Sequence, residues 1–469
     1  MIRFGTGGWR AVIGDEFTRA NVEKLTAALA RKIKAEGADN RGFVIGYDRR
    51  FLSRQAAEWA AGVMAAEGIH TWLIGREAPT PMIMYTVKYY NAGYGLSVTA
   101  SHNPALYNGV KVFTAGGRDA DETVTADIER HLDEAPPEIT AVPFETAVDS
   151  GAVEIINPQN LYIDSILRAI NTDAIRAREL KAALDPMYGV SKTSLQTILL
   201  TARCDVDVIH DRHDTLFGGR LPAPAADTLN ALRAFVLEHK PDIGIATDGD
   251  ADRIGVIDEK GRFLHPNQIL SLLYYYLLKH KNWKGPVVRN LATTHVLDRI
   301  AEDFGQVCYE VPVGFKHISA KMAETHAVVG GESSGGLTVR GHIMGKDGIY
   351  AAALLVEMIA VTGRSLSEIA DEIASRYGGA HMAEYSVRFS DKRRDEIIET
   401  LLIQRKLPSF SHTVDKVSYA DGCKVYFNNG GWVSARFSGT EPLLRIFCEM
   451  EDERTALETE GVMRVFLGV

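Results

Sequence analysis

The sequence predicts an α/β protein of several domains, the last of which is a smaller α+β domain. The chain has 469 residues, which is too long for one hydrophobic core and corresponds to roughly three or four domains. Over most of its length, short apolar runs alternate with polar loops and helical periods, as in parallel sheets covered by helices. Near the C-terminus the pattern changes to alternating strands with flanking helices, which indicates an α+β fold.

The expected strands end in polar loops. An apolar run at 42–48 precedes a helical period at 53–67, and a run at 93–99 leads into the loop at 101–108. Ligands bind beyond the carboxyl ends of parallel strands, so these loops are where a functional site is expected. The remaining expected strands lie at 242–246, 254–257, 286–289 (before a helix beginning near Thr293), 328–329, 383–389, 423–427, 432–437 and 445–449.

Breaks in this pattern suggest the domain boundaries. Pro136, Pro137 and Pro143 lie in a stretch of low periodicity, which favours a linker. A tight turn follows the strand at 254–257, and Tyr377-Gly378-Gly379 marks another break. The expected domains are 1–150, 151–257, 258–375 and 380–469.

The composition excludes several classes of protein. Hydrophobic residues make up 46% and charged residues 24%, as in an ordinary soluble globular protein. The net charge of −9, without a block of Lys or Arg, argues against nucleic-acid binding. The four cysteines lack zinc-site spacing, and the apolar stretch at 272–278 is far too short to span a bilayer. With no apolar leader at the N-terminus, we expect a cytoplasmic protein with no membrane contact.

The loop after the strand at 93–99 carries Ser101 and His102 in the motif TASHNP, with Lys111 ten residues after Ser101. A serine exposed at a strand end can act as a nucleophile or carry a phosphoryl group. An isolated Ser-His pair is more often a simple turn with a capping residue. The G-x-S-x-G elbow of many hydrolases is absent, which argues against that class.

The motif DGDADR places Asp248, Asp250 and Asp252 at alternate positions of one loop, followed by Arg253. Three carboxylates on small spacers can converge on one hard cation such as Mg²⁺, and without a cation they would repel one another. An EF-hand calcium loop is excluded because its sixth position, which requires Gly, is Arg253, and because strands flank the motif.

Three further segments can contact a polar ligand. The loop at 330–336 (GGESSGG) offers Glu332 and Ser334 to sugar hydroxyls, although a plain flexible loop is an equal alternative. The segment RFSGTEP and the next arginine present two cations around a turn that can hold a phosphate, although helix capping explains part of it. The N-terminal GTGGWR is a Gly-rich loop that ends at Arg10, and alone it is weak support.

Together and in this order, these segments resemble the α-D-phosphohexomutase superfamily, and more closely its phosphoglucomutase/phosphomannomutase branch. The resemblance runs from Phe4 to Glu449, and its three motifs TASHNP, DGDADR and RFSGTEP rarely occur together elsewhere. It implies four domains around a central cleft: three similar mixed α/β-sheet domains and a smaller C-terminal phosphate-binding domain. It also implies an enzyme that interconverts hexose 1- and 6-phosphates, of glucose or mannose, through a hexose 1,6-bisphosphate.

The resemblance assigns roles to individual residues. Ser101 would be the phosphorylated serine and, with the three aspartates, a ligand of Mg²⁺, while Arg10 and Arg253 would lie beside the transferred group. Lys111 or His102 would handle the proton. Glu332 and Ser334 would bind sugar hydroxyls, and Lys346 the substrate phosphate. The phosphate that is not transferred would be bound by Arg436, Ser438, Gly439, Thr440 and Arg445.

One departure from the family pattern concerns the sugar loop. Many relatives carry His where this chain has Gly336, so the preferred hexose stays open. A mutase for glucosamine phosphate or pentose phosphate is the alternative among mutases, and a bisphosphate-dependent phosphatase is another enzyme class. A non-catalytic sugar-phosphate-binding scaffold is disfavoured because a pure binder needs no nucleophile beside a metal. We expect a monomer or homodimer, and all of these expectations require Ser101 and the aspartates to share one cavity.

Overall fold

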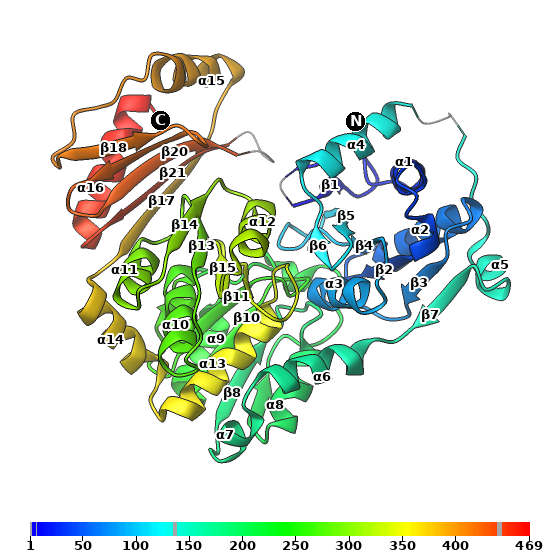
Figure 1. Cartoon of the computed structure of the whole chain (residues 1–469), viewed down its shortest axis with the longest axis horizontal. Helices are drawn as coiled ribbons and strands as arrows, with labels where there is room; N and C mark the ends of the chain where they lie inside the picture. The colour runs from blue at the N-terminus through cyan, green and yellow to red at the C-terminus, as the bar shows by residue number, and fades with distance from the viewer. Residues whose placement is uncertain (1, 6, 135–137, 439–442) are drawn as a thin grey trace.

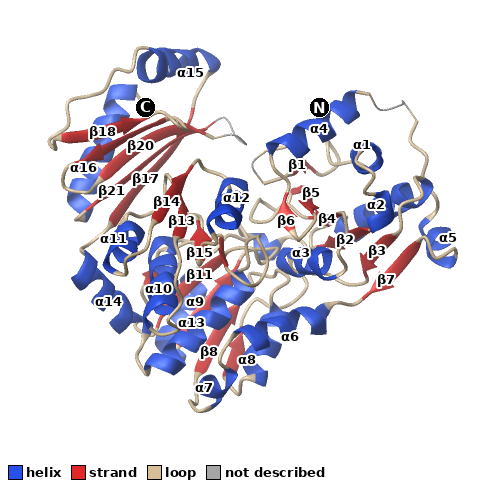
Figure 2. Cartoon of the chain, in the orientation of Figure 1, coloured by secondary structure: helices blue, strands red, loops and turns tan. Residues whose placement is uncertain are grey.

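The computed structural model describes residues 2–5, 7–134, 138–438 and 443–469. Four sheets follow one another along the chain, and each has its own helices (Figures 1 and 2). The first three sheets are mixed and lie between helices, while the fourth is antiparallel. In Figure 1 the C-terminal domain, in orange and red, lies across the molecule from the blue N-terminal domain.

The first sheet has the strand order β1-β5-β4-β2-β3-β7, with β6 paired to β5. β2 to β4 are parallel, and their carboxyl ends carry the loops that begin at Asp48 and Thr99. The elements of this domain are β1 (Trp9–Val12), α1 (Arg19–Ala35), β2 (Phe43–Tyr47), α2 (Ser53–Ala66), β3 (Thr71–Ile74), α3 (Thr80–Tyr89), β4 (Tyr94–Val98), β5 (Tyr107–Thr114), β6 (Arg118–Asp119), α4 (Glu122–Asp133), α5 (Phe144–Asp149) and β7 (Val153–Ile156).

The second sheet has the order β12-β11-β10-β8-β9, and its parallel pairs β8–β10 and β8–β9 are extended by antiparallel β11. The turn from β10 to β11 carries the DGDADR motif. The elements are α6 (Gln159–Ala169), α7 (Thr172–Arg176), β8 (Lys181–Asp185), α8 (Lys192–Thr201), β9 (Asp205–Val208), α9 (Asn230–His239), β10 (Ile243–Thr247), β11 (Ile254–Asp258) and β12 (Phe263–Leu264).

The third sheet has the order β14-β13-β15-β16. The turn between β15 and β16 carries the GGESSGG loop, and the helix expected near Thr293 begins at Val296. The elements are α10 (Pro266–Lys279), β13 (Val287–Asn290), α11 (Val296–Asp303), β14 (Cys308–Val311), α12 (Phe315–Thr325), β15 (Val329–Gly331), β16 (Leu337–Val339), α13 (Gly348–Thr362) and α14 (Leu366–Tyr377).

The fourth sheet has the order β17-β21-β20-β19-β18, with α16 packed on β17 and β21. In β17, exposed side chains alternate with less exposed ones from Ala383 onward, as expected for a strand of a sheet with one covered face. The elements are β17 (His381–Arg388), α15 (Asp391–Ile397), β18 (Val414–Ser418), β19 (Cys423–Phe427), β20 (Trp432–Phe437), β21 (Leu443–Met450) and α16 (Glu453–Leu467).

Two sheets extend past the boundaries expected from the sequence. β7 pairs in parallel with β3, so the first sheet continues beyond residue 150. β12 pairs with β11, so the second sheet continues beyond residue 257. The break that follows 254–257 is therefore a turn within the second sheet.

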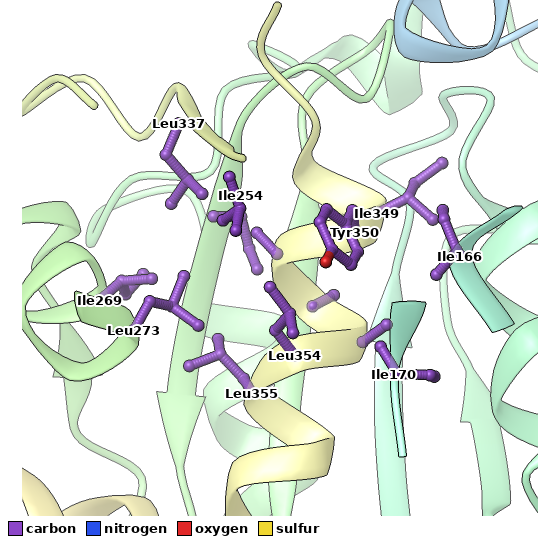
Figure 3. Close-up of a cluster of buried hydrophobic side chains, with 14 of the residues drawn as sticks. Ile166, Ile170, Ile254, Ile269, Leu273, Leu337, Ile349, Tyr350, Leu354 and Leu355 are labelled. Carbon is purple, nitrogen blue, oxygen red and sulfur yellow. The ribbon is translucent and has the colours of Figure 1, made fainter. Parts of the chain in front are cut away.

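The helix α13 lies within a hydrophobic core to which the first three domains contribute (Figure 3). Its side chains Ile349, Leu354 and Leu355 pack with Ile254 of β11 and Leu273 of α10. In the described part of the chain, no helix alone is long and apolar enough to cross a bilayer. The pair α13 and α14 passes that test only when joined across an 86° bend.

The C-terminal domain has a separate hydrophobic core and meets the third domain through polar side chains. The buried Lys424 Nζ of β19 donates to Glu310 Oε2 of β14 at 2.7 Å and to the Leu291 carbonyl at 2.6 Å. His295 lies beside it, with its ring stacked 5.8 Å from that of Tyr426, and its backbone N–H donates to Glu449 Oε1. These contacts join the C-terminal domain to the third domain.

Candidate active site

Ser101 lies directly beyond the carboxyl end of β4 and is fully buried. Its Oγ donates a hydrogen bond of 2.7 Å to Asp248 Oδ2, which comes from the second domain. The structure therefore brings the serine and the aspartate loop, far apart in the sequence, into one site. The backbone of Ser101 has φ +53°, in the left-handed region that is unfavourable for residues with a side chain.

Asp248, Asp250 and Asp252 occupy the turn from β10 to β11, and all three are buried. One carboxylate oxygen from each lies within 4.8 Å of the other two, a spacing suited to one cation. Among the described residues, Asp250 Oδ1 and Asp252 Oδ1 have no hydrogen-bond partner although both are buried. Orphaned carboxylate oxygens at this spacing fit a hard divalent cation, which takes oxygen ligands.

The carboxyl groups of this loop have pKa values that are shifted in opposite directions. Burial, together with the Asp250 and Asp252 carboxylates, raises the pKa of Asp248 well above its ordinary value. Burial also opposes ionisation of Asp252, but Lys111, Lys346 and Arg253 outweigh it and keep the pKa of that carboxyl low. Asp248 is thus the carboxyl whose ionised form its surroundings stabilise least, and a bound cation would favour its ionisation.

Two lysines contact the aspartates directly. Lys111 Nζ of β5 donates to Asp250 Oδ2 and Asp252 Oδ2, each at 2.6 Å. Burial disfavours its charge, yet these two carboxylates raise the pKa of Lys111 above its ordinary value. Lys346 Nζ, from the segment before α13, lies 3.0 Å from Asp252 Oδ2, so the third domain also reaches this loop.

Two arginines complete the cationic surroundings. Arg10 of β1 donates from Nη1 to Asn103 Oδ1. Burial, and the neighbouring charge of Arg253, lower the pKa of Arg10 to about 10. Arg253 donates its backbone N–H to Asp248 Oδ1 at 3.0 Å and pairs as an isolated bridge with Gly336.

His102 is a candidate proton carrier beside the serine. Its Nδ1 lies 3.5 Å from Ser101 Oγ. Burial, with the charges of Arg253 and Arg10, lowers its pKa well below the ordinary value, so the ring is neutral at pH 7. A neutral ring can accept a proton, whereas Lys111 is held protonated by its two carboxylates.

The sugar loop lies between β15 and β16. Glu332 Oε1 accepts hydrogen bonds from Asn290 Nδ2 at 3.0 Å and from the Gly314 N–H at 3.3 Å, while Ser334 is exposed. A Cβ on Gly336 would meet Lys346 Cδ at 2.3 Å. The stem of Lys346 therefore occupies the space where a side chain at position 336 would lie.

A cavity of about 530 Å³, counting space open to solvent, lies between the first and third domains. It is lined by glycines of the N-terminal Gly-rich loop and by the charged residues Lys111, Asp119, Lys316 and Lys346. The edge of the aspartate site is therefore accessible from this cavity.

The phosphate segment of the C-terminal domain lies apart from this cavity, whose described lining comes from the first and third domains. Arg436 of β20 and Arg445 of β21 stand directly opposite each other across the sheet, and Arg436 Nε lies 3.1 Å from Asp421 Oδ2. Facing arginines repel each other unless an anion lies between them. Ser438 follows β20 directly, while Gly439 and Thr440 lie outside the described residues.

Four residues of the site were missed in the sequence. Thr80 Oγ1 donates to Asp250 Oδ2 at 2.6 Å, Asn103 accepts from Arg10, and Asp48 and Arg50 contact the serine loop. Asp48 and Arg50 directly follow the buried strand β2, which is the signal that could have found them. Thr80 opens α3 and carries no pattern of its own.

Comparisons with known proteins agree along the whole chain. Four domain families match in order: phosphoglucomutase/phosphomannomutase alpha/beta/alpha domains I, II and III at residues 1–138, 160–261 and 265–377, and the C-terminal domain at 387–463. A phosphoglucomutase/phosphomannomutase of Thermococcus kodakarensis is 30% identical over 97% of this chain and 96% of its own. A probable phosphoglucosamine mutase of Methanothermobacter thermautotrophicus is also 30% identical, over 97% and 95%.

Solved structures give the same result. The crystal structure of a putative phosphomannomutase from Thermus thermophilus superposes with a TM-score of 0.86 at 30% identity, covering 100% of this chain and 99% of that one. A phosphoglucomutase from Paramecium in its open form has the same fold, with a TM-score of 0.82 at 21% identity over 100% and 95% of the two chains. The chain therefore belongs to the phosphoglucomutase/phosphomannomutase family.

Proposed function

We propose that this enzyme interconverts hexose 1-phosphates and hexose 6-phosphates by way of a phosphorylated Ser101. Enzymes of the family are isomerases that move a phosphoryl group within one sugar. The observation that carries the proposal is the 2.7 Å hydrogen bond from Ser101 Oγ to Asp248, which places a nucleophile beside three buried carboxylates. A scaffold that only binds sugar phosphates has no use for this arrangement.

The aspartate loop is the proposed Mg²⁺ site. Asp248, Asp250 and Asp252 would hold the ion together with an oxygen of phosphorylated Ser101, using the oxygens that otherwise lack partners. When bound, Mg²⁺ supplies a compact positive charge to the oxygens of the transferred phosphoryl group.

The surrounding cations stabilise the same charge. Phosphoryl transfer depends chiefly on positioning and electrostatic stabilisation of the equatorial oxygens. Lys111 bonds Asp250 and Asp252, Arg10 bonds Asn103 of the serine loop, and the charge of Arg253 acts on Asp252, so these three cations would supply this charge. Either His102 or Lys111 would take the proton of the attacking sugar hydroxyl, and the neutral His102, at 3.5 Å from Ser101 Oγ, has the better geometry for a base.

The proposed reaction has two halves. The phosphoryl group on Ser101 passes to the free O6 or O1 of the substrate, which gives a hexose 1,6-bisphosphate and a free serine hydroxyl. The bisphosphate then turns over in the cleft, and its other phosphoryl group returns to Ser101. Throughout, Glu332 and Ser334 would hold sugar hydroxyls, and Lys346 a substrate phosphate.

The distal phosphate would be held by the C-terminal domain. Arg436, Ser438, Gly439, Thr440 and Arg445 form the proposed clamp, which accepts either end of the sugar. Arg436 and Arg445 face each other on one side of the sheet, so that one phosphate can bridge both. For this the domain must move toward the serine, a closure of the kind that governs many enzymes with mobile domains.

A second candidate substrate is glucosamine phosphate. The support is that curated relatives named probable phosphoglucosamine mutases are as similar as the phosphoglucomutase/phosphomannomutase, at 30–32% identity over 97–98% of this chain. Gly336 removes the His that many relatives present to the sugar. A pentose phosphate remains a third candidate.

The experiment compares wild type and Ser101→Ala on the 1-phosphates of glucose, mannose, glucosamine and ribose. We expect Ser101→Ala to lose turnover while it still binds sugar phosphate, and wild type to carry one phosphoryl group that phosphatase removes, as read by intact mass. Full activity of Ser101→Ala would refute the phosphoserine. Steady release of inorganic phosphate would identify a phosphatase instead.

A further inference from the structure

Arg50 lies under the serine loop and is almost fully buried, with 3% of its surface exposed. Its Nη2 donates to the carbonyls of Ser101 at 2.7 Å and Asn103 at 2.6 Å. Its Nη1 donates to the carbonyls of Pro104 at 2.9 Å and Tyr107 at 3.0 Å. One planar guanidinium therefore holds four backbone oxygens of one short loop, which is a geometry that only arginine provides.

The other side of the Ser101 backbone is held from the same strand end. The Ser101 N–H donates to Thr99 Oγ1 at 2.8 Å, and Thr99 Oγ1 donates to Asp48 Oδ2 at 2.6 Å. Asp48 Oδ1 accepts from the backbone N–H of Arg50 at 2.9 Å and from Ser53 Oγ at 2.8 Å. The N–H of Ser101 is thus held by Thr99 after β4, which Asp48 fixes in turn, and its carbonyl is held by Arg50 after β2.

The hydrogen bonds to the N–H and to the carbonyl of Ser101 explain how its backbone keeps a strained conformation. A residue with a side chain keeps a φ of +53° only where its surroundings fix the conformation. The strain turns the serine so that Oγ points at Asp248, while its carbonyl points down at Arg50. Without the guanidinium, the loop can relax to a common conformation, and the hydroxyl then leaves the aspartate loop.

Residues of the second domain pack against the serine loop and against Arg50. A Cβ on Gly249 would lie 2.7 Å from the Ser101 carbonyl oxygen, so the absence of a side chain lets the aspartate loop approach. The Arg50 guanidinium itself lies 4.8 Å from the ring centre of Phe217, which belongs to the second domain. The carbonyl of Ser101 is therefore enclosed between Arg50 and the aspartate loop.

We propose that Arg50 is a positioning residue for the phosphoryl transfer: its guanidinium fixes the strained backbone of Ser101 so that Oγ stays aligned with the aspartate loop in both half-reactions. Arg50 does not touch the substrate, and it acts through the serine loop. The proposal rests on the proposed role of Ser101. It requires the planar fork of arginine and not only a positive charge.

The test measures kcat and KM of Arg50→Lys, Arg50→Met and Thr99→Val with the best 1-phosphate substrate. A displacement of the reacting atom of about 1 Å costs roughly 100-fold in rate, so we expect kcat of both Arg50 variants to fall about 10- to 100-fold with little change in KM. Thr99→Val keeps the shape but loses the hydroxyl that holds the Ser101 N–H, and kcat should fall in the same way. The rate at which glucose 1,6-bisphosphate phosphorylates Ser101, followed by intact mass, should fall in parallel.

Arg49→Met is the matched control. Arg49 neighbours Arg50, is partly buried, and donates to backbone carbonyls of Tyr188, Asp211 and Arg212, which lie outside the serine loop. We expect its kcat to equal that of wild type. An equal loss of kcat in Arg49→Met, or a wild-type kcat in Arg50→Lys, would overturn the proposal.

If the Arg50 variants do not fold, as judged by circular dichroism, Thr99→Val decides, and an unchanged kcat there overturns the proposal. Ser101→Ala separates the two hypotheses. If that variant is inactive while the Arg50 variants are fully active, the positioning role is wrong and the phosphoserine stands. If it is active, the proposed function itself has failed.

Discussion

Acid should weaken the attachment of the C-terminal domain through His295. The ring is 15% exposed and stacks on Tyr426 of β19. Burial, and the neighbouring charge of Arg289, lower its pKa from 6.5 to about 4. The charged and titratable groups that face it are Arg289, Asp298, Glu310, Lys424 and Glu449.

The sign and size of the expected change in the free energy of unfolding follow from proton linkage. A base with a lowered pKa in the folded state contributes stability that is present above pH 6.5 and is lost as the pH falls toward 4. A shift of one pKa unit corresponds to roughly 1.4 kcal/mol, so the full loss in the free energy of unfolding is about 3 kcal/mol. Between pH 7 and pH 5 the same relation gives a loss of about 2 kcal/mol.

The assay is urea unfolding at pH 7 and pH 5, followed by tryptophan fluorescence, to which Trp432 contributes; the ring centre of Trp432 lies 5.8 Å from that of His295. His295→Gln keeps an acceptor for Lys424 but cannot be protonated. Because Glu310 and Asp298 also have lowered pKa values and lose stability in acid, the decisive quantity is the difference between the two proteins. We expect wild type to lose about 2 kcal/mol more than His295→Gln. Equal losses would refute this reasoning.

Three other outcomes follow from the structure. Removal of divalent ions with EDTA should abolish turnover, and Mg²⁺ should restore it while the far-ultraviolet circular dichroism stays constant; full activity after EDTA would exclude a metal role. Arg436→Gln should raise KM about 10- to 100-fold with kcat little changed, because a hydrogen bond to a charged group contributes about 1.5–3 kcal/mol; an unchanged KM in steady-state assays contradicts the phosphate clamp. Leu354→Ala should lower the free energy of unfolding by about 2–5 kcal/mol, since this side chain is fully buried, whereas Val465→Ala, at a residue that is 77% exposed, should change it little in the same urea titration.

Much of the site could be predicted because its residues follow strands in short motifs. Ser101 after β4 and the aspartates after β10 are recognisable from a buried strand that ends in a polar loop. The structure then brings the two loops together. Arg50 and Asp48 have the same relation to β2, but their function depends on contacts with a loop some fifty positions later, which no local pattern reveals.

The domain boundaries were less predictable for the same reason. β7 joins the first sheet by pairing with β3, and β1 pairs with β5 far along the chain, so the partners are set by tertiary packing. The position of Arg436 relative to Ser101 depends on how the C-terminal domain is attached through Lys424 and His295. Single side chains at an interface carry no periodic signal.

The separate hydrophobic core of the C-terminal domain determines which motion is cheap. A swing of this domain as a rigid body leaves its own hydrophobic core intact and breaks mainly polar contacts, such as that between Lys424 and Glu310, together with the packing of His295 on Tyr426 and Trp432. By contrast, separating the second domain from the third would disrupt the packing around α13 and expose apolar surface to water, which costs free energy at each turnover. The architecture thus favours motion between the C-terminal domain and the third domain, while the packed domains that carry the serine and aspartate loops stay rigid.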